Sequence, residues 1–152
     1  MAALKDSLRS NLTASMKARD ELRSSTLRMV LTAVTNAEVS GRQARELSDD
    51  EVVAVLASEA KKRREAAAAF EDAERPELAT KERAEAVILA EFLPEPLTDD
   101  EVRALVTAAI TELRAGAEGM RAMGRVMGTV TPQVKGRADG GAVAAEVRRQ
   151  LG

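Results

Sequence analysis

Apolar residues recur every three or four positions along most of the chain, which is the spacing of a helix that buries one face. Residues 3–18 begin this pattern, since Leu4, Leu8, Leu12 and Met16 follow one another at steps of four. No segment keeps the alternation of apolar and polar residues that indicates a half-buried strand. The pattern therefore predicts an all-α protein.

Signals for helix ends divide the first half of the chain into four helices. Asp20 can cap a second helix that runs to about Val39. Ser48 begins a capping-box pattern, which opens a long third helix. Pro76 fits the first turn of a fourth helix that ends near Phe92.

A boundary follows at residues 93–97, LPEPL. Each proline lacks an amide hydrogen and disfavours helical geometry in the residue before it. A second capping-box pattern at Thr98 opens a fifth helix, a sixth is expected over about 120–130 and ends before Pro132, and a last helix follows Gly140 and Gly141. We therefore predict an N-terminal four-helix domain, residues 1–95, and a smaller C-terminal three-helix domain, residues 96–152.

The amino-acid composition excludes or disfavours several kinds of catalytic and metal-binding site. Cys and His are both absent, which excludes disulfides, thiol nucleophiles and the commonest metal ligand. The serines have no Gly-x-Ser-x-Gly context, and neither a P-loop nor a dinucleotide-binding glycine pattern occurs. The paired acids beside Ser48 and Thr98 are accounted for by the capping boxes. We expect no catalytic residue, no cofactor and no metal.

The first ten residues, MAALKDSLRS, lack the apolar run of a signal peptide, and no stretch approaches the roughly 20 apolar residues of a membrane span. These features predict a cytoplasmic protein with no membrane partner.

Charge is unevenly distributed. The net charge is −2, and residues 1–95 carry fifteen Lys and Arg against eighteen Asp and Glu. Residues 114–152 carry seven cations against three anions. The overall acidity disfavours indiscriminate binding to polyanions such as DNA, whereas the basic tail permits a local anion site.

The run KKRR at residues 61–64 has the composition of a nucleic-acid patch. Four consecutive residues fan out around most of a helix, and Glu59 and Glu65 flank these four. An ordinary solvated face is the favoured interpretation.

The segment MGRVMGTVTPQVKGRADGG, residues 123–141, holds five of the nine glycines. Gly124 and Gly128 lie four apart on one helix face, where missing side chains let another backbone approach. Glycine within a helix costs about 1 kcal/mol relative to alanine, so a compensating contact is expected. Met120, Met123 and Met127 add a soft apolar surface, although core packing is the better interpretation for at least two of them.

The turn that follows has two interpretations, and physical arguments leave both open. Lys135, Gly136 and Arg137 can form an anion site in which backbone amides and two cations face a phosphate, with Asp139 capping the next helix. They can equally form a surface turn with solvated cations. The chain has no Trp or Tyr and two Phe, which disfavours stacking on single-stranded bases and leaves folded RNA, recognised by its shape.

The segment MGRVMGTVTPQVKGRADGGAVAAEVRRQL resembles the C-terminal signature of the GatB/YqeY family, in which a Met-Gly-x-Val-Met helix precedes a Lys-Gly-[Arg/Lys]-Ala-[Asp/Asn] turn. LRMVLTAVTNAEV, EVVAVLASEAKKRREAAAAFEDAERPEL and LPEPLTDDEVRALV are similar to stretches of free-standing YqeY-like proteins. The similarity follows the whole chain in order. Thr131-Pro132 replaces the more usual apolar-Pro pair, which leaves the turn intact.

The resemblance implies an N-terminal helical domain and a C-terminal three-helix domain. The same module forms the tail of the B subunit of the glutamyl/aspartyl-tRNA amidotransferase, where it contacts the tRNA elbow while other domains perform catalysis. A related module is fused to some glutaminyl-tRNA synthetases. The nucleic-acid-binding residues that the resemblance implies are Lys135, Gly136, Arg137, Gly124 and Gly128, and Arg125 on the same helix is expected to be a further contact.

Three functions follow as expectations. The first is a tRNA-binding accessory module related to tRNA-dependent amidotransferase. The second is a protein-interaction module that docks onto an aminoacyl-tRNA synthetase, an amidotransferase or itself through the Met and Gly face of the sixth helix. The third is an enzyme of the carbon–nitrogen ligase class with glutamine as amido donor, although the chain contains no amidotransferase core.

Overall fold

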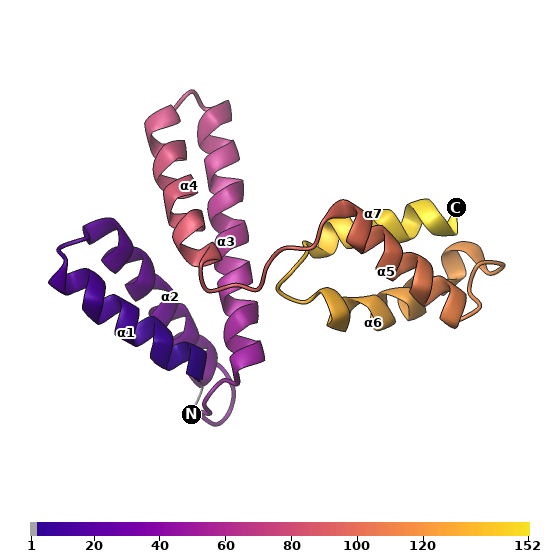
Figure 1. Cartoon of the computed structure of the whole chain (residues 1–152), viewed down its shortest axis with the longest axis horizontal. Helices are drawn as coiled ribbons and strands as arrows, with labels where there is room; N and C mark the ends of the chain where they lie inside the picture. Colours follow the sequence, from indigo (N-terminus) through magenta and orange to yellow (C-terminus); the bar gives the residue numbers. More distant parts are fainter. Residues whose placement is uncertain (1–2) are drawn as a thin grey trace. The chain divides into compact units, whose positions relative to one another are not determined.

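The computed structural model describes residues 3–152, and every regular element within them is helical (Figure 1). The prediction of an all-α protein is confirmed. The chain divides into two compact units, of which the first ends at Leu93 and the second is Pro94–Gly152. None of the described helices is long and apolar enough to cross a membrane.

The first unit is built from two helical hairpins. Its helices are α1 (Ala3–Lys17), α2 (Glu21–Val39), α3 (Asp49–Asp72) and α4 (Pro76–Ala90). Figure 1 shows α1 beside α2, and α3 beside α4. The apolar core beneath them comprises Leu8, Leu27, Val30, Val34, Leu47, Val52, Leu56, Ala60 and Leu89.

Two of the predicted helix starts in this unit are confirmed by hydrogen bonds at their caps. The Asp20 carboxylate accepts from the amide of Arg23 at 3.1 Å, and the Ser48 hydroxyl accepts from the amide of Glu51 at 3.3 Å. Each side chain thus satisfies an amide that the first turn of its helix leaves unpaired.

The expectation of a solvated face for the KKRR run is wrong at one position. Arg63 is buried: its Nε donates to Glu85 of α4 at 3.2 Å, and its Nη1 donates to the backbone carbonyl of Glu59 at 3.0 Å. The reason is helical phase, because Arg63 lies three residues after buried Ala60 and four before buried Ala67. A buried guanidinium requires such partners, since an unpaired charge in the core is costly.

The second unit packs three α-helices around a core of small apolar residues. Its elements are α5 (Asp99–Glu112), a short 3₁₀ helix η1 (Gly119–Ala122), α6 (Met123–Val134) and α7 (Gly140–Leu151). The core consists of Val102, Val106, Ala109, Ala115, Ala122, Val126, Val130, Val134, Val143, Val147 and Leu151.

The predicted caps of this unit are also confirmed. Thr98 and Glu101 form both halves of a capping box at the start of α5. The Asp139 carboxylate accepts from the amide of Ala142 at 3.3 Å, which makes it the N-cap of α7. The Asp139 carboxylate, which lies in the basic turn after α6, therefore acts as the cap of α7.

The predicted end of the sixth helix before Pro132 is wrong, because α6 continues through Pro132 to Val134. A proline in a helix removes the donor to the carbonyl four residues earlier, which here belongs to Gly128. Gly128 is exposed, so water can reach that carbonyl. Val130 and Val134, on either side of the proline, are both buried, and their packing holds the last turn in place.

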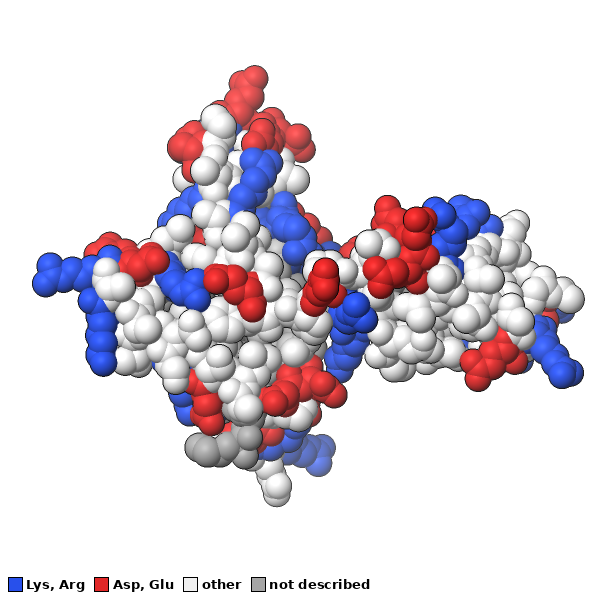
Figure 2. All heavy atoms as spheres, in the orientation of Figure 1, with Lys and Arg blue, Asp and Glu red and all other residues white. Residues whose placement is uncertain are grey.

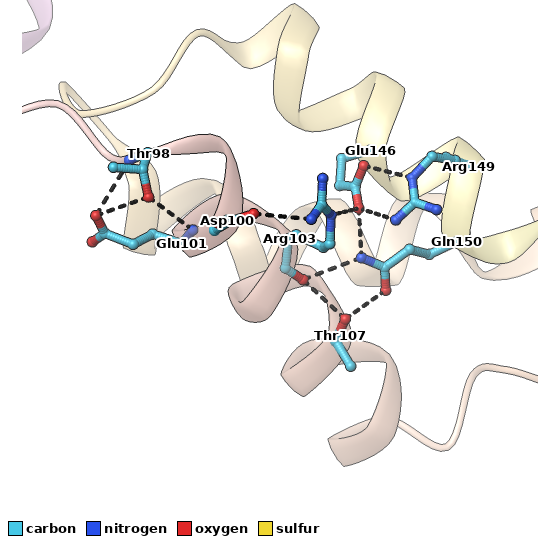
Figure 3. A network of polar contacts seen from close by, with 8 residues as sticks. All are labelled: Thr98, Asp100, Glu101, Arg103, Thr107, Glu146, Arg149 and Gln150. Atoms are coloured by element: carbon cyan, nitrogen blue, oxygen red, sulfur yellow. Dashed lines mark hydrogen bonds and ion pairs between the residues drawn. The ribbon is translucent and has the colours of Figure 1, made fainter.

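A polar network joins α7 to α5 on the surface of the second unit (Figure 3). Arg149 binds Glu146 in two-point geometry, at 2.9 and 2.6 Å, and Gln150 donates to the same carboxylate at 2.8 Å. Gln150 also donates to the carbonyl of Arg103 and accepts from the hydroxyl of Thr107. The hydrogen bonds that Glu146 accepts from Arg149 and Gln150 lower its pKa to about 2, with the Arg149 bond as the main cause.

Candidate nucleic-acid interface

One face of α6 is buried and the opposite face is open. Val126, Val130 and Val134 point into the core, whereas Gly124 and Gly128 are exposed. A Cβ atom built on either glycine would meet no atom within 4 Å. The two glycines therefore leave a smooth strip of backbone on the outer face of the helix.

The fold itself gives no reason for glycine at these two positions. Both lie within a regular α-helix, and neither has the positive φ that excludes other residues. Neither is crowded by a neighbouring segment. Helical glycine is destabilising by about 1 kcal/mol relative to alanine, and the contacts of the described residues do not offset that cost at these two positions.

The turn after α6 requires its glycine. Gly136 has a φ of 74°, a conformation that side chains disfavour. The amides of Arg137 and Ala138 both donate to the carbonyl of Val134, at 2.8 and 3.0 Å. Fewer backbone amides are thus free to face a phosphate than the anion-site interpretation requires, because these two amides already have an acceptor within the turn.

Arg137 also holds the segment that precedes α5. Its Nε donates to the backbone carbonyl of Glu95 at 3.0 Å, and its own carbonyl accepts from the amide of Leu97 at 2.8 Å. Sequence reasoning missed this structural role, since no local pattern links residues 42 positions apart. Arg137 is half-buried as a result, while Lys135 is exposed.

Arg125 lies at the other end of α6 from Lys135. Ten residues of helix separate the two, or about 15 Å. Arg125 forms an ion pair with Glu118 at 2.9 Å, and both side chains remain about half exposed. The structure therefore does not bring Arg125 into the turn: Arg125 lies next to Gly124, whereas Lys135 lies seven residues beyond Gly128, at the opposite end of α6.

The two cations of the turn differ from Arg125 in their ion pairing. Among residues 3–152, neither Lys135 nor Arg137 forms an ion pair. Figure 2 shows a largely uncharged surface over α6, with charged groups at its margins. The arrangement can accommodate a smooth backbone on the strip with an anion at its Lys135 end.

The methionines of this region divide between core and surface. Met123 and Met127 are partly buried and pack against the core of the second unit, which confirms core packing for two of the three. Met120 is 49% exposed. The soft apolar surface on this side of the molecule is consequently small.

Comparison with known proteins gives two findings. The profile of the family described as Yqey-like protein matches residues 5–151. An uncharacterized protein of Schizosaccharomyces pombe is 38% identical over 88 residues, which are 58% of this chain and 70% of the relative.

Proposed function

This chain belongs to the YqeY-like protein family, and we propose that it is an accessory module that binds folded tRNA through its second unit. The observation that carries the proposal is the pair of glycines at 124 and 128, which the fold does not need and which leave room for a backbone to approach. The family resemblance supplies the class of ligand, because the related tail domain of the amidotransferase B subunit contacts the tRNA elbow.

The charges beside the strip favour RNA over a neutral partner. Lys135 is exposed and without an acid partner within the described residues, so it can pair with a phosphate at no cost to the fold. Arg125 could meet a second phosphate about 15 Å away, after releasing Glu118. Contacts of this kind recognise shape and backbone and do not require the aromatic platforms that the chain lacks.

The proposed division of labour follows the two units. We assign residues 1–95 and 96–152 to two domains, a boundary two residues from the division of the chain at Leu93 and Pro94, with RNA binding in the second domain and a cytoplasmic location for the whole. The chemistry of any amidotransfer belongs to partners of the module.

A direct test measures tRNA affinity at several salt concentrations for the wild type, Lys135→Ala and Gly128→Gln. Lys135→Ala should weaken binding to every tRNA alike and flatten the slope of log affinity against log salt by about 0.7–0.9, because one phosphate contact is lost. Gly128→Gln should weaken binding with little change in that slope, since it adds bulk without charge. Arg137 is unsuitable for this test because its side chain also holds Glu95.

The matched control is Lys17→Ala, which removes an exposed Lys from the first unit. It should bind tRNA like the wild type. If Lys135→Ala and Gly128→Gln also bind like the wild type at the same salt concentration, the α6 strip is not the RNA surface.

Protein docking on the same face is the second candidate, and the exposed Met120 favours it. In that case Gly124→Leu would remove a protein partner from pull-downs while leaving tRNA affinity unchanged. Met123 and Met127 pack against the core, as the sequence predicts for two of the three methionines, so this alternative has little exposed apolar surface.

A further inference from the structure

The first unit contains a groove of about 770 Å³ at the far ends of its two hairpins. The end of α1, the turn into α2 and the first half of α2 form one side, and Lys81 of α4 lies on the other. We call this the hairpin groove; the residues of its lining used below are Met16, Arg19, Glu21, Leu22, Arg28 and Lys81. It lies in a different unit from the α6 strip, so it is independent of the proposed RNA surface.

The hairpin groove combines apolar surface with an excess of positive charge. Met16 is 44% exposed and Leu22 is partly exposed, which leaves apolar surface open to solvent. Arg19, Arg28 and Lys81 face a single acid of the lining, Glu21. This local excess contrasts with the first unit as a whole, where acids outnumber bases.

The three cations of the groove differ from most arginines of this unit in having no acid partner. Arg23, Arg45, Arg75 and Arg83 each form an ion pair at 2.8 Å or less. No ion pair is formed by the groove cations among the residues that the structure describes; Arg28 contacts the sulfur of Met16 at 3.2 Å instead. The cations are thus available to an incoming acid.

The α1–α2 side of the groove is already ordered. The hydroxyls of Ser15 and Ser24 form a buried hydrogen bond of 2.8 Å between α1 and α2. Arg19 takes the left-handed conformation, with φ of 59°, at the turn, and Asp20 caps α2. A ligand therefore meets a preformed wall, which reduces the ordering that binding requires.

We propose that the hairpin groove binds an amphipathic helical segment of a partner protein, with apolar residues on one face and Asp or Glu along its edges. Such a segment places its apolar face on Met16 and Leu22 and its acids against Arg28 and Lys81, which is helix-in-groove recognition with complementary charge. A protein segment fits better than RNA because a sugar-phosphate backbone offers no apolar groups to pack against Met16 and Leu22. The lining also contains no aromatic side chain on which a base could stack.

Selection from a random peptide library tests the proposal, with the full-length protein as bait and peptides of about 16 residues, a little over four helical turns. The selected sequences should be acidic and have apolar residues at helical spacing. In titrations with those peptides, Arg28→Glu with Lys81→Glu should bind at least about tenfold more weakly, because two attractions become repulsions.

The control pair is Arg42→Glu with Arg64→Glu, which makes the same charge change at exposed residues outside the groove. It should retain wild-type affinity. Should the charge-reversed groove variant fail to fold, as judged by circular dichroism, Arg28→Gln with Lys81→Gln replaces it, with a smaller loss expected.

Three outcomes overturn the proposal. One is a selection without enrichment, or with enrichment of basic peptides or of peptides without helical apolar spacing. The second is equal loss of peptide affinity in the groove and control variants. The third is loss of tRNA binding in the groove variant, which would assign the groove to RNA, whereas failure of Lys135→Ala to affect tRNA would overturn only the proposed function of the second unit.

Discussion

At the scale of single residues, the informative positions are those where local pattern and tertiary role disagree. The spacing of Gly124 and Gly128 predicts an open helix face, and that part of the candidate site follows from sequence because it depends only on helical periodicity. The bond from Arg137 to the Glu95 carbonyl could not be predicted, since it joins segments far apart in the chain. Arg63 could have been recognised from its phase relative to Ala60 and Ala67.

Gly128→Ala should stabilise the second unit, because the new methyl group enters open space and the helix gains propensity. We expect the free energy of unfolding, measured by denaturant titration followed by circular dichroism, to rise by about 0.5–1 kcal/mol. Gly136→Ala serves as the opposite control and should destabilise the unit, since its φ of 74° strains any side chain. A loss of stability in Gly128→Ala would mean that the backbone of α6 needs this glycine.

At the scale of helices, sequence signals located starts better than ends. Asp20, Ser48, Thr98 and Asp139 all cap the helices that they were predicted to open, because a cap depends on a few neighbouring residues. The end of α6 was misplaced because Pro132 is a local signal, and the packing of the valines around it outweighs that signal. Helix ends of this kind are decided by tertiary contacts.

The network on α7 predicts a pH dependence of stability. The pKa of Glu146 is lowered from 4.5 to about 2 in the folded protein, so its contribution is complete above about pH 4.5 and disappears as the pH falls through about 2. The difference in melting temperature between the wild type and Glu146→Gln should therefore be largest at neutral pH and shrink toward pH 2. Glu112→Gln, which alters an exposed acid of α5 outside the network, should show no such trend; an equally pH-dependent difference there would contradict the assignment to Glu146.

At the scale of the whole molecule, the helical class follows from composition and periodicity, whereas the assembly of helices into cores does not. Each of the two compact units has a separate apolar core, the first rich in leucine and the second in valine and alanine. The predicted domain boundary between residues 95 and 96 lies two residues from the division of the chain between Leu93 and Pro94, and it remains a prediction.

Expressed alone, residues 94–152 should fold, because the segment includes every residue of its core and the Glu95 carbonyl that Arg137 contacts. We expect a helical circular dichroism spectrum and cooperative thermal unfolding of the fragment. Its melting temperature should lie within a few degrees of that of the second unit in the full chain, which is the transition that Gly128→Ala shifts. A fragment that is unfolded, while the full chain melts cooperatively, would show that the second unit depends on the first.

The composition of α6 has a consequence for attempts to study the proposed RNA surface on a peptide. This helix has twelve residues, of which two are glycines and one is an interior proline, and helices of that length are marginal in water even with favourable sequences. Its shape is imposed by the valines of α5 and α7 beneath it. A synthetic peptide copied from α6 and its turn should not keep the helical shape of the intact protein, so the RNA binding that we propose should be lost from the peptide and from short linear grafts into other proteins.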